Sequence, residues 1–450
     1  MKTRLLTNNT YWDWALFFSI LLYQIVPSVY NSYNIYLIGN AIPSENSLAI
    51  VSQWQFIQVI VEIIQESLVF PIFYFIGSQL KGGNMKILSS RIAIIFRLLL
   101  IILLPITVIL FFQIDLFVNI IDTPEEIIYA TKSYLEIRIG ALTISIINIG
   151  LIIIVESLNK KKLLLKILLL KMIFFLVFDS LFFGGYSFSM DLGIRGVALS
   201  NLIVEVLILI FVSICITRIT KTNILRGFNS KFEFADLKLF GRISIGIGIE
   251  SAIKNIAYLT MIITIINTLG TKPIGGYYLS MHFFWSFLLV PILSLADTLK
   301  VLIANNFNNI HAIKNLLKFG FFTTLLLFFC WLLLIPVLDP IFKYFNKDIE
   351  IVNYAKIAFY ILFLPYCLLS LNLILNSVFY GLGDTKYLAY KSIITNLSVY
   401  LVAYVCYKTQ LWTPTFSSVL ILFSIGIVVG TVLTCYFVDK ILKDRSRVVL

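Results

Sequence analysis

The stretch YGLGDTKYLAYK, Tyr380–Lys391, stands between two long apolar runs and contains one aspartate and two lysines. The hydrocarbon interior of a membrane disfavours charges at this density, so the stretch indicates a loop at a membrane surface. Its glycines permit a tight turn, and its lysines are expected to stay with water and anionic headgroups. The stretch therefore predicts a polar turn that joins two membrane-spanning helices.

The composition of the whole chain agrees with this prediction. Of the 450 residues, 60% are hydrophobic and 13% are charged, and the mean hydropathy is +0.96. A water-soluble domain could not bury so much apolar surface in one core. The apolar runs are continuous and longer than barrel strands, which argues against a closed β-barrel. We predict an all-α integral membrane protein.

A helix needs about 20 mainly apolar residues to cross the hydrocarbon layer. About twelve runs of this kind are predicted. The first is too long for the apolar part of a signal peptide, so we interpret it as the first span. The spans are 12–38, 47–77, 87–112, 128–155, 163–184, 194–217, 240–268, 274–303, 317–337, 352–379, 388–407 and 414–438.

The net charge of +12 is distributed unevenly. Lys and Arg gather in alternate loops, as in NKKKLLLK at 159–166, whereas GNAIPSEN and QIDLFVNIIDTPEE are poor in them. Basic loops face the cytoplasm by the positive-inside rule. We predict a multi-pass protein of the cell membrane with both termini in the cytoplasm and with membrane lipids, not nucleic acid, as its partners.

Six spans in each half imply a parallel repeat. VESLNKKKLLLKILL after the fourth span corresponds to FYGLGDTKYLAYKSI after the tenth. The predicted division is a six-helix lobe at 1–217, a cytoplasmic linker at 218–239 and a second six-helix lobe at 240–450. No loop is long enough for a catalytic domain, and we find no phosphate-binding glycine loop and no zinc motif. We predict neither an enzyme nor a metal centre, and no cofactor.

Four stretches resemble the multidrug and toxic compound extrusion (MATE) family. GLGDTKYLAYKSIITN is similar to the family's turn into its eleventh helix, and DLGIRGVALSN to the entry of its sixth. YNIYLIGNA and IINTLGTKPIGGYYLS are looser matches. The resemblance implies two pseudo-symmetric six-helix lobes around a central cleft. It also implies export of amphipathic, often cationic compounds in exchange for H+ or Na+.

Carboxylates at membrane depth mark a transport path or an internal ion pair. Glu62 and Glu66 are one helical turn apart, and burial with mutual repulsion favours proton binding by one of them. Alternatively, they pair with polar groups between helices and never titrate. Glu205 is alone on an apolar helix and should be protonated or have a partner. Asp297 and Lys300 are expected to form an ion pair or to reach towards water.

Glu250 and Asp179 are also carboxylates at membrane depth, and the family resemblance adds a counterpart for each. Glu250 corresponds to a seventh-helix glutamate, but Lys254 four residues later would neutralise it as a helical ion pair. Lys254 could instead pair with Glu62, Glu66 or Glu205 across the cleft. Asp179 resembles the fifth-helix aspartate, although Phe175 stands where the family has asparagine. Its alternative is a solvated helix end.

Two departures from the family pattern leave the coupling ion, H+ or Na+, open. Asn34 occupies the place of a first-helix aspartate, and the tenth span has no acidic residue at 351–379.

Aromatic side chains are abundant, and most are expected to face lipid or the core. A minority near the acids is expected to line a substrate cleft, where flat cations bind by stacking and cation–π contact. Together with Asn34, these candidates are Trp54, Tyr258, Phe283, Phe284 and Trp285.

The predicted function is thus that of a monomeric, cation-coupled exporter of a small amphipathic substrate. Two other classes of function make different demands on the sequence. A flippase for lipid-linked oligosaccharides would need a cationic cleft, for which Lys254 is a candidate. A membrane-embedded enzyme would need convergent catalytic residues at one face of the bilayer, and the sequence contains no such group.

Overall fold

The computed structural model describes residues 12–41, 50–51, 53–80, 85–120, 125–220, 234–345 and 348–448. These residues form helices and connecting turns, with no strand among them, so the predicted all-α class is confirmed. Contacts divide the chain into two compact units. We call Leu22–Gly241 the N-terminal unit. Arg242–Leu450, grouped with the chain up to Leu21, is the C-terminal unit.

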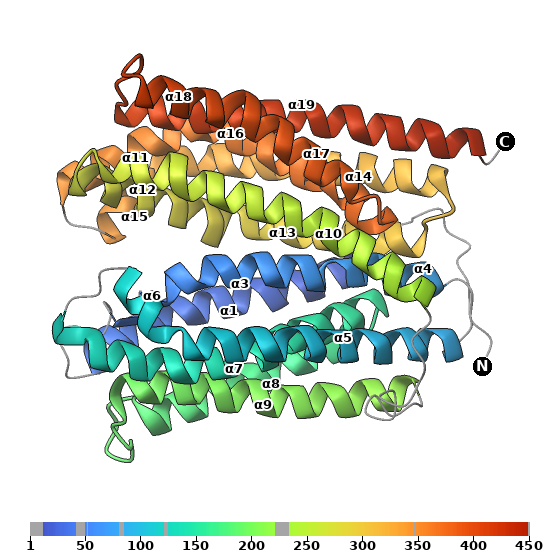
Figure 1. The fold of residues 1–450 in the computed structure, drawn as a ribbon, viewed down its shortest axis with the longest axis horizontal. Coiled ribbons are helices and arrows are strands. Elements are labelled where there is room, and N and C mark those ends of the chain that lie inside the picture. Colours follow the sequence, from blue (N-terminus) through green and yellow to red (C-terminus); the bar gives the residue numbers. More distant parts are fainter. Residues whose placement is uncertain are drawn as a thin grey trace. The chain divides into compact units, whose positions relative to one another are not determined.

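Long helices run side by side within the N-terminal unit, drawn in blue to green in Figure 1. α7 is packed against α5, α8 and α9 and against both α3 and α4. The elements are α1 (Trp14–Ala41), α3 (Trp54–Val69), α4 (Pro71–Leu80), α5 (Met85–Phe112), α6 (Ile114–Ile120), η1 (Glu125–Ile127), α7 (Ile128–Ser157), α8 (Lys161–Phe182) and α9 (Gly193–Thr220).

The C-terminal unit is organised around α16, which packs against α12, α13 and α19. Three of its helices contain a π-helical segment, here η3, η4 and η6. The elements are α10 (Phe234–Ala257), η3 (Tyr258–Ile263), α11 (Thr264–Asn267), α12 (Thr271–Phe283), η4 (Phe284–Leu288), α13 (Leu289–Asn305), α14 (Ile310–Leu334), η5 (Ile335–Val337), α15 (Leu338–Phe345), α16 (Ile349–Leu382), α17 (Lys386–Thr395), η6 (Asn396–Leu401), α18 (Val402–Lys408) and α19 (Phe416–Val448).

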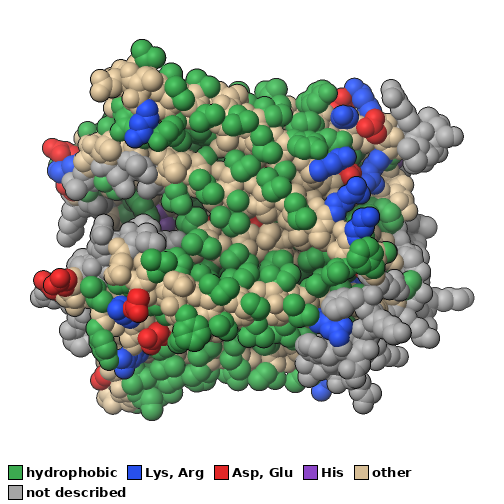
Figure 2. Space-filling view, viewed as in Figure 1, with side chains coloured by type: hydrophobic (Ala, Val, Ile, Leu, Met, Phe, Trp, Pro, Cys, Tyr) green, Lys and Arg blue, Asp and Glu red, His purple; other side chains and the backbone are tan. Residues whose placement is uncertain are grey.

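Eleven helical stretches in the described residues are long and apolar enough to cross a membrane. The remaining predicted span, 163–184, corresponds to α8, which has the length but is more polar. Beyond its first turn, this helix carries three charged residues: Lys166, Lys171 and Asp179. Figure 2 shows hydrophobic side chains over the middle of the helices and charged side chains mainly near their ends.

The GLGDTK turn, which joins α16 and α17, contacts three other helices. Gly383 ends α16 in the left-handed region, with φ of 71°, where glycine is strain-free. Asp384 pairs with Arg445 of α19 at 3.1 Å. The hydroxyl of Thr385 donates to the carbonyl of Ile243 in α10 at 2.8 Å. Gly381 approaches α13 so closely that an added Cβ would lie 2.7 Å from Cγ2 of Ile303.

The two lysines of this stretch have different surroundings. Lys386 is exposed at the first position of α17, as expected. Lys391 is only 7% exposed, so the prediction that it stays with water is wrong. α17 begins at Lys386 and therefore carries Lys391 more than one helical turn into the protein.

The predicted linker at 218–239 begins and ends in helix. α9 extends to Thr220 and α10 begins at Phe234, and the part between them lies outside the described residues. Asp236 in the first turn of α10 pairs with Arg91 of α5 at 2.8 Å, with both side chains largely buried. Both residues belong to the N-terminal unit, which therefore includes the first turns of α10, up to Gly241.

Candidate functional site

Asp179 lies in a cage formed by three helices of the N-terminal unit. The carboxyl, on α8, is 2% exposed. Its Oδ2 accepts hydrogen bonds from the Tyr30 hydroxyl at 2.6 Å and from Nδ2 of Asn34 at 2.7 Å. Its Oδ1 accepts a third from the hydroxyl of Ser200 on α9. The alternative of a solvated helix end is therefore wrong for this residue.

The cage supplies neutral donors only. Within the described part of the chain, no Lys or Arg forms an ion pair with Asp179. Hydroxyl and amide donors satisfy the hydrogen-bonding capacity of a carboxylate but do not neutralise its charge. Phe175, which replaces the family's asparagine, stacks on Tyr30 with ring centroids 5.7 Å apart. The carboxyl of Asp179 is thus buried without a counterion among the described residues.

Sequence reasoning identified Asp179 and Asn34 but missed Tyr30 and Ser200. Tyr30 precedes Asn34 by four residues and so lies on the same face of α1, which is a signal that could have found it. Ser200 had no comparable signal. It lies within the quoted DLGIRGVALSN stretch, but its role depends on how α9 packs against α8.

Glu205, by contrast, has an internal cation. Its Oε1 lies 2.9 Å from Nζ of Lys171 on α8, and its Oε2 accepts from Nδ2 of Asn148 on α7 at 2.6 Å. The same amide group donates to the backbone carbonyl of Glu205 at 2.8 Å. Glu205 was expected either to be protonated or to have a partner, and the structure shows a partner, Lys171. Such a pair is expected to hold α7, α8 and α9 together.

Glu250 also lies beside an internal cation, although a different one from that expected. Oε1 of Glu250 is 3.9 Å from Nζ of Lys391, and both residues are 7% exposed. Lys391 also donates to Oδ1 of Asn376 on α16 at 3.0 Å. Lys254, the predicted partner, is exposed on α10 and interacts electrostatically with Lys391. Oε2 of Glu250 has no hydrogen-bond partner in the described part of the chain.

The pair Glu62 and Glu66 lies on α3 as predicted, but it does not form a buried dyad. Glu62 is exposed and accepts from Nε2 of Gln58 at 3.3 Å. Glu66 is half-buried. In the C-terminal unit, the expected ion pair between Asp297 and Lys300 is confirmed, with 2.7 Å between Oδ1 and Nζ.

The aromatic candidates differ in their surroundings. Phe283 and Phe284 are 6% and 0% exposed and belong to the hydrophobic core of the C-terminal unit. They have almost no side-chain surface for a substrate. Trp285 is 46% exposed and donates to the Tyr366 hydroxyl at 3.2 Å. The half-buried Tyr258 shares a hydrogen bond of 2.9 Å with Tyr277.

Trp54 lies on the wall of a small cavity in the N-terminal unit. The cavity has a volume of about 110 Å³ and is also lined by Gln65, Arg138, Ser145 and Asn201, among others. The guanidinium carbon of Arg138 is 4.8 Å from the centroid of the Trp54 ring. The aromatic surface proposed for a cationic substrate is therefore already in contact with a cation of the protein.

Comparison with known proteins identifies a family domain in the C-terminal half. Residues 247–405 match the family model MatE, a range that includes the GLGDTK turn. Comparison with the curated proteins finds no relative with significant similarity.

Solved structures of MATE transporters share the fold of the chain. A point mutant of the Vibrio cholerae MATE transporter VcmN has a TM-score of 0.84 at 16% identity, covering 95% of this chain and 96% of that one. An outward-facing multidrug resistance MATE transporter of the MOP superfamily has a TM-score of 0.82 at 17% identity, and the match covers 96% of this chain and 95% of that one. A MOP superfamily transporter from Pyrococcus furiosus has a TM-score of 0.81 at 16% identity, and the match covers 96% of this chain and 95% of that one.

These comparisons confirm the resemblance that the sequence motifs indicated. Identities this low establish the fold, which is the two-lobe arrangement of MATE transporters. The MatE match adds a sequence relationship over residues 247–405.

Proposed function

We propose that the chain is a cation-coupled secondary exporter of amphipathic, often cationic organic compounds that works by alternating access. The MatE match and the fold support a transporter of this class. The observation that carries the coupling site is the cage around Asp179. Glu205 and Glu250 each have a lysine beside them, whereas Asp179 has three neutral donors and, among the described residues, no cation beside it.

A buried anion without a counterion is costly at membrane depth, and an external cation offsets that cost. We propose that the cation is a proton that binds to the carboxyl of Asp179. A neutral carboxyl has one O–H to donate, so one of the hydroxyl donors has to rotate and accept instead. Tyr30 and Asn34 are on α1 and Ser200 is on α9. Protonation would therefore weaken the attachment of both helices to α8 and favour a different arrangement of the unit.

The available energy is sufficient for export. One charge that crosses a potential of about 100 mV releases about 2.3 kcal/mol, and about 1.4 kcal/mol corresponds to a tenfold concentration ratio. One proton per cycle can thus sustain about a 50-fold gradient of an uncharged substrate. Exchange of one proton for one monovalent cation moves no net charge, so export of a cationic substrate at this ratio is driven by the pH gradient. In this proposal the protein works in the cell membrane as a monomer, with both termini in the cytoplasm. It needs no cofactor besides the coupling ion and is not an enzyme.

The test is efflux of a cationic dye from proteoliposomes on which proton and sodium gradients are imposed separately. Asp179→Asn is expected to abolish gradient-driven efflux, because an amide can neither lose nor bind the proton. Asp191→Asn is the matched control, since Asp191 is exposed in the turn that precedes α9. If a sodium gradient alone drove efflux, the coupling ion in the proposal would be Na+ and not H+. Undiminished gradient-driven efflux by Asp179→Asn would refute the coupling site.

One observation favours a second candidate function. Arg138 lines the cavity beside Trp54, and its Nε has no hydrogen-bond partner in the described residues. A cation at this depth suits the anionic headgroup of a lipid-linked substrate, as expected for a flippase. Inhibition of dye efflux by an isoprenyl diphosphate, lost in Arg138→Gln, would support this candidate. Dye efflux that is insensitive to the diphosphate would exclude it.

A further inference from the structure

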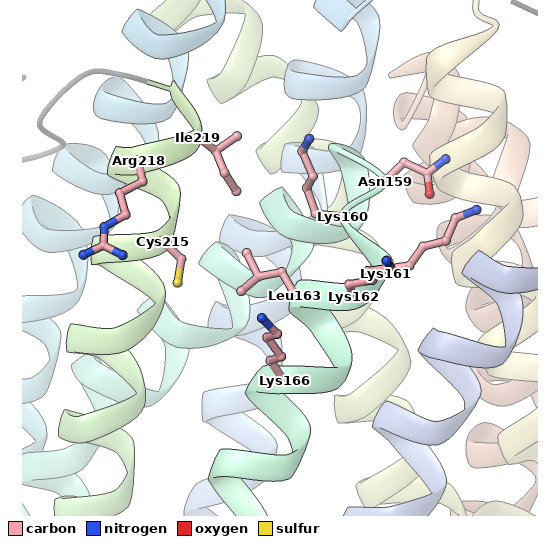
Figure 3. A pocket seen from close by; sticks show the side chains of 9 residues that line it. All are labelled: Asn159, Lys160, Lys161, Lys162, Leu163, Lys166, Cys215, Arg218 and Ile219. Atoms are coloured by element: carbon pink, nitrogen blue, oxygen red, sulfur yellow. The ribbon is translucent and has the colours of Figure 1, made fainter. Parts of the chain in front are cut away.

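A second cavity lies at the basic end of the N-terminal unit, away from the Asp179 cage. It has a volume of about 620 Å³ and lies between the beginning of α8 and the end of α9. Figure 3 shows Lys160, Leu163 and Lys166 in the space between these two helices, with Cys215 and Ile219 on α9. The charged side chains that line it are all basic: Lys160, Lys161, Lys162, Lys166 and Arg218.

The lysines occupy an electrostatically unfavourable place. α8 begins at Lys161, and its first turn contains no acidic residue. The N-cap residue, Lys160, makes no side-chain hydrogen bond to the helix. The N-terminal end of a helix carries partial positive charge and favours anions, so lysines there repel both the helix end and one another. The sequence thus concentrates positive charge where the fold would be stabilised by a negative group.

Four of the basic side chains at this cavity have no acidic partner among the described residues. In the described residues, no ion pair is formed by Lys160, Lys162, Lys166 or Arg218, and all four are exposed. The walls between them are less polar, because Leu163, Cys215 and Ile219 also line the cavity. The site therefore combines a cationic rim with an apolar wall.

We propose that this cavity binds an anionic phospholipid, with its phosphate held by Lys160, Lys162 and Lys166 and with part of an acyl chain against Leu163 and Ile219. Charge complementarity selects a phosphate. The apolar wall and the position at the ends of two membrane helices select a lipid over a free phosphate ion. The positive-inside rule places this end at the cytoplasmic leaflet, where basic pockets between helices bind anionic headgroups.

The experiment compares lipid binding to the detergent-purified full chain by native mass spectrometry. The probes are phosphatidylglycerol, phosphatidylcholine and inorganic phosphate. The test variant is Lys160→Gln/Lys162→Gln/Lys166→Gln. The matched control is Lys314→Gln/Lys318→Gln/Lys386→Gln, which removes the same charge from three exposed lysines of the C-terminal unit. Thermal unfolding of each variant verifies that it is folded.

The wild type and the control are expected to retain phosphatidylglycerol at least about tenfold better than phosphatidylcholine, and the test variant is expected to lose this preference. A single Lys166→Gln substitution, which keeps the N-cap region intact, is expected to lose part of it. Unchanged preference in both test variants would overturn the proposal. Displacement of the lipid by millimolar inorganic phosphate would overturn the assignment to a lipid. Neither result bears on coupling at Asp179, which is tested separately.

Discussion

The ammonium group of Lys391 lies 3.9 Å from Oε1 of Glu250, and both side chains are buried in the C-terminal unit. Each partner comes from a different helix, α17 and α10. The pair resembles that of Glu205 and Lys171 in the N-terminal unit, where the distance is 2.9 Å. In both cases the protein supplies the positive charge itself. Among the residues that the structure describes, Asp179 has no such charge beside it, which is why we propose the coupling role for it.

Removal of Lys391 is expected to leave Glu250 as a buried anion. Breaking a buried pair by deleting one partner typically costs about 3–5 kcal/mol, and we expect Lys391→Gln to lower the free energy of unfolding by about 3 kcal/mol. The double variant Glu250→Gln/Lys391→Gln should recover part of this loss, because two amides carry no charge. Chemical unfolding of the two single variants and the double variant measures the coupling. Losses that simply add would show that the two residues do not interact.

Tyr30 is expected to contribute to stability through its hydrogen bond to the carboxyl of Asp179. A hydrogen bond to a charged group contributes about 1.5–3 kcal/mol. Tyr30→Phe should therefore lower the free energy of unfolding by about 2 kcal/mol and also reduce proton-driven efflux.

Tyr344→Phe serves as the control for Tyr30→Phe, because Tyr344 is 88% exposed. Both proteins should be expressed and measured in the same detergent. Equal stability of the two variants would mean that the Tyr30 hydroxyl does not hold the carboxyl.

Gly383 is expected to tolerate no side chain without cost. An L-residue in the left-handed region costs about 1–2 kcal/mol, so Gly383→Ala should destabilise the protein by about 1 kcal/mol. Gly140→Ala is a contrasting change, because Gly140 is inside α7 and an added Cβ meets nothing within 4 Å. Alanine favours a helix over glycine by about 1 kcal/mol, so this variant should be slightly more stable. Thermal unfolding measures both variants. A melting temperature that changes in the same direction for both would contradict the prediction.

The orientation in the membrane can be measured with single cysteines. Asn308 is exposed between α13 and α14, and Thr413 is exposed between α18 and α19. In intact cells, an impermeant thiol reagent is expected to label Thr413→Cys, whereas Asn308→Cys should react only after permeabilisation. The parent chain with its five native cysteines gives the background. The opposite pattern would reverse the predicted topology.

The spans were predictable because the length of an apolar run is a local property of the sequence. Predicted bounds such as 87–112 and 128–155 lie within two residues of α5 and α7. Asp179 was also found, because a carboxylate at membrane depth is conspicuous in any context. The family resemblance gave the same residue.

The partners of the carboxylates were harder to predict, because they depend on which helix faces pack together. Lys391 was grouped with the loop lysines, since a sequence does not show where a helix starts relative to the membrane surface. Ser200 carries no local signal, because its contact with Asp179 depends on how α9 packs against α8. Phe283 and Phe284 were expected beside a cleft and lie in the core, since aromatic residues suit both places.

The π-helical segments η3, η4 and η6 all belong to the C-terminal unit, and the described residues of the N-terminal unit contain none. A widened turn of this kind loses regular backbone bonds and lets a helix bend at low cost. The two units are therefore both helical but differ in where they carry π-helical turns. Within the C-terminal unit, bending during a working cycle is expected to concentrate at Tyr258–Ile263, Phe284–Leu288 and Asn396–Leu401, whereas the N-terminal unit is expected to rearrange at the contacts of Asp179 with α1 and α9.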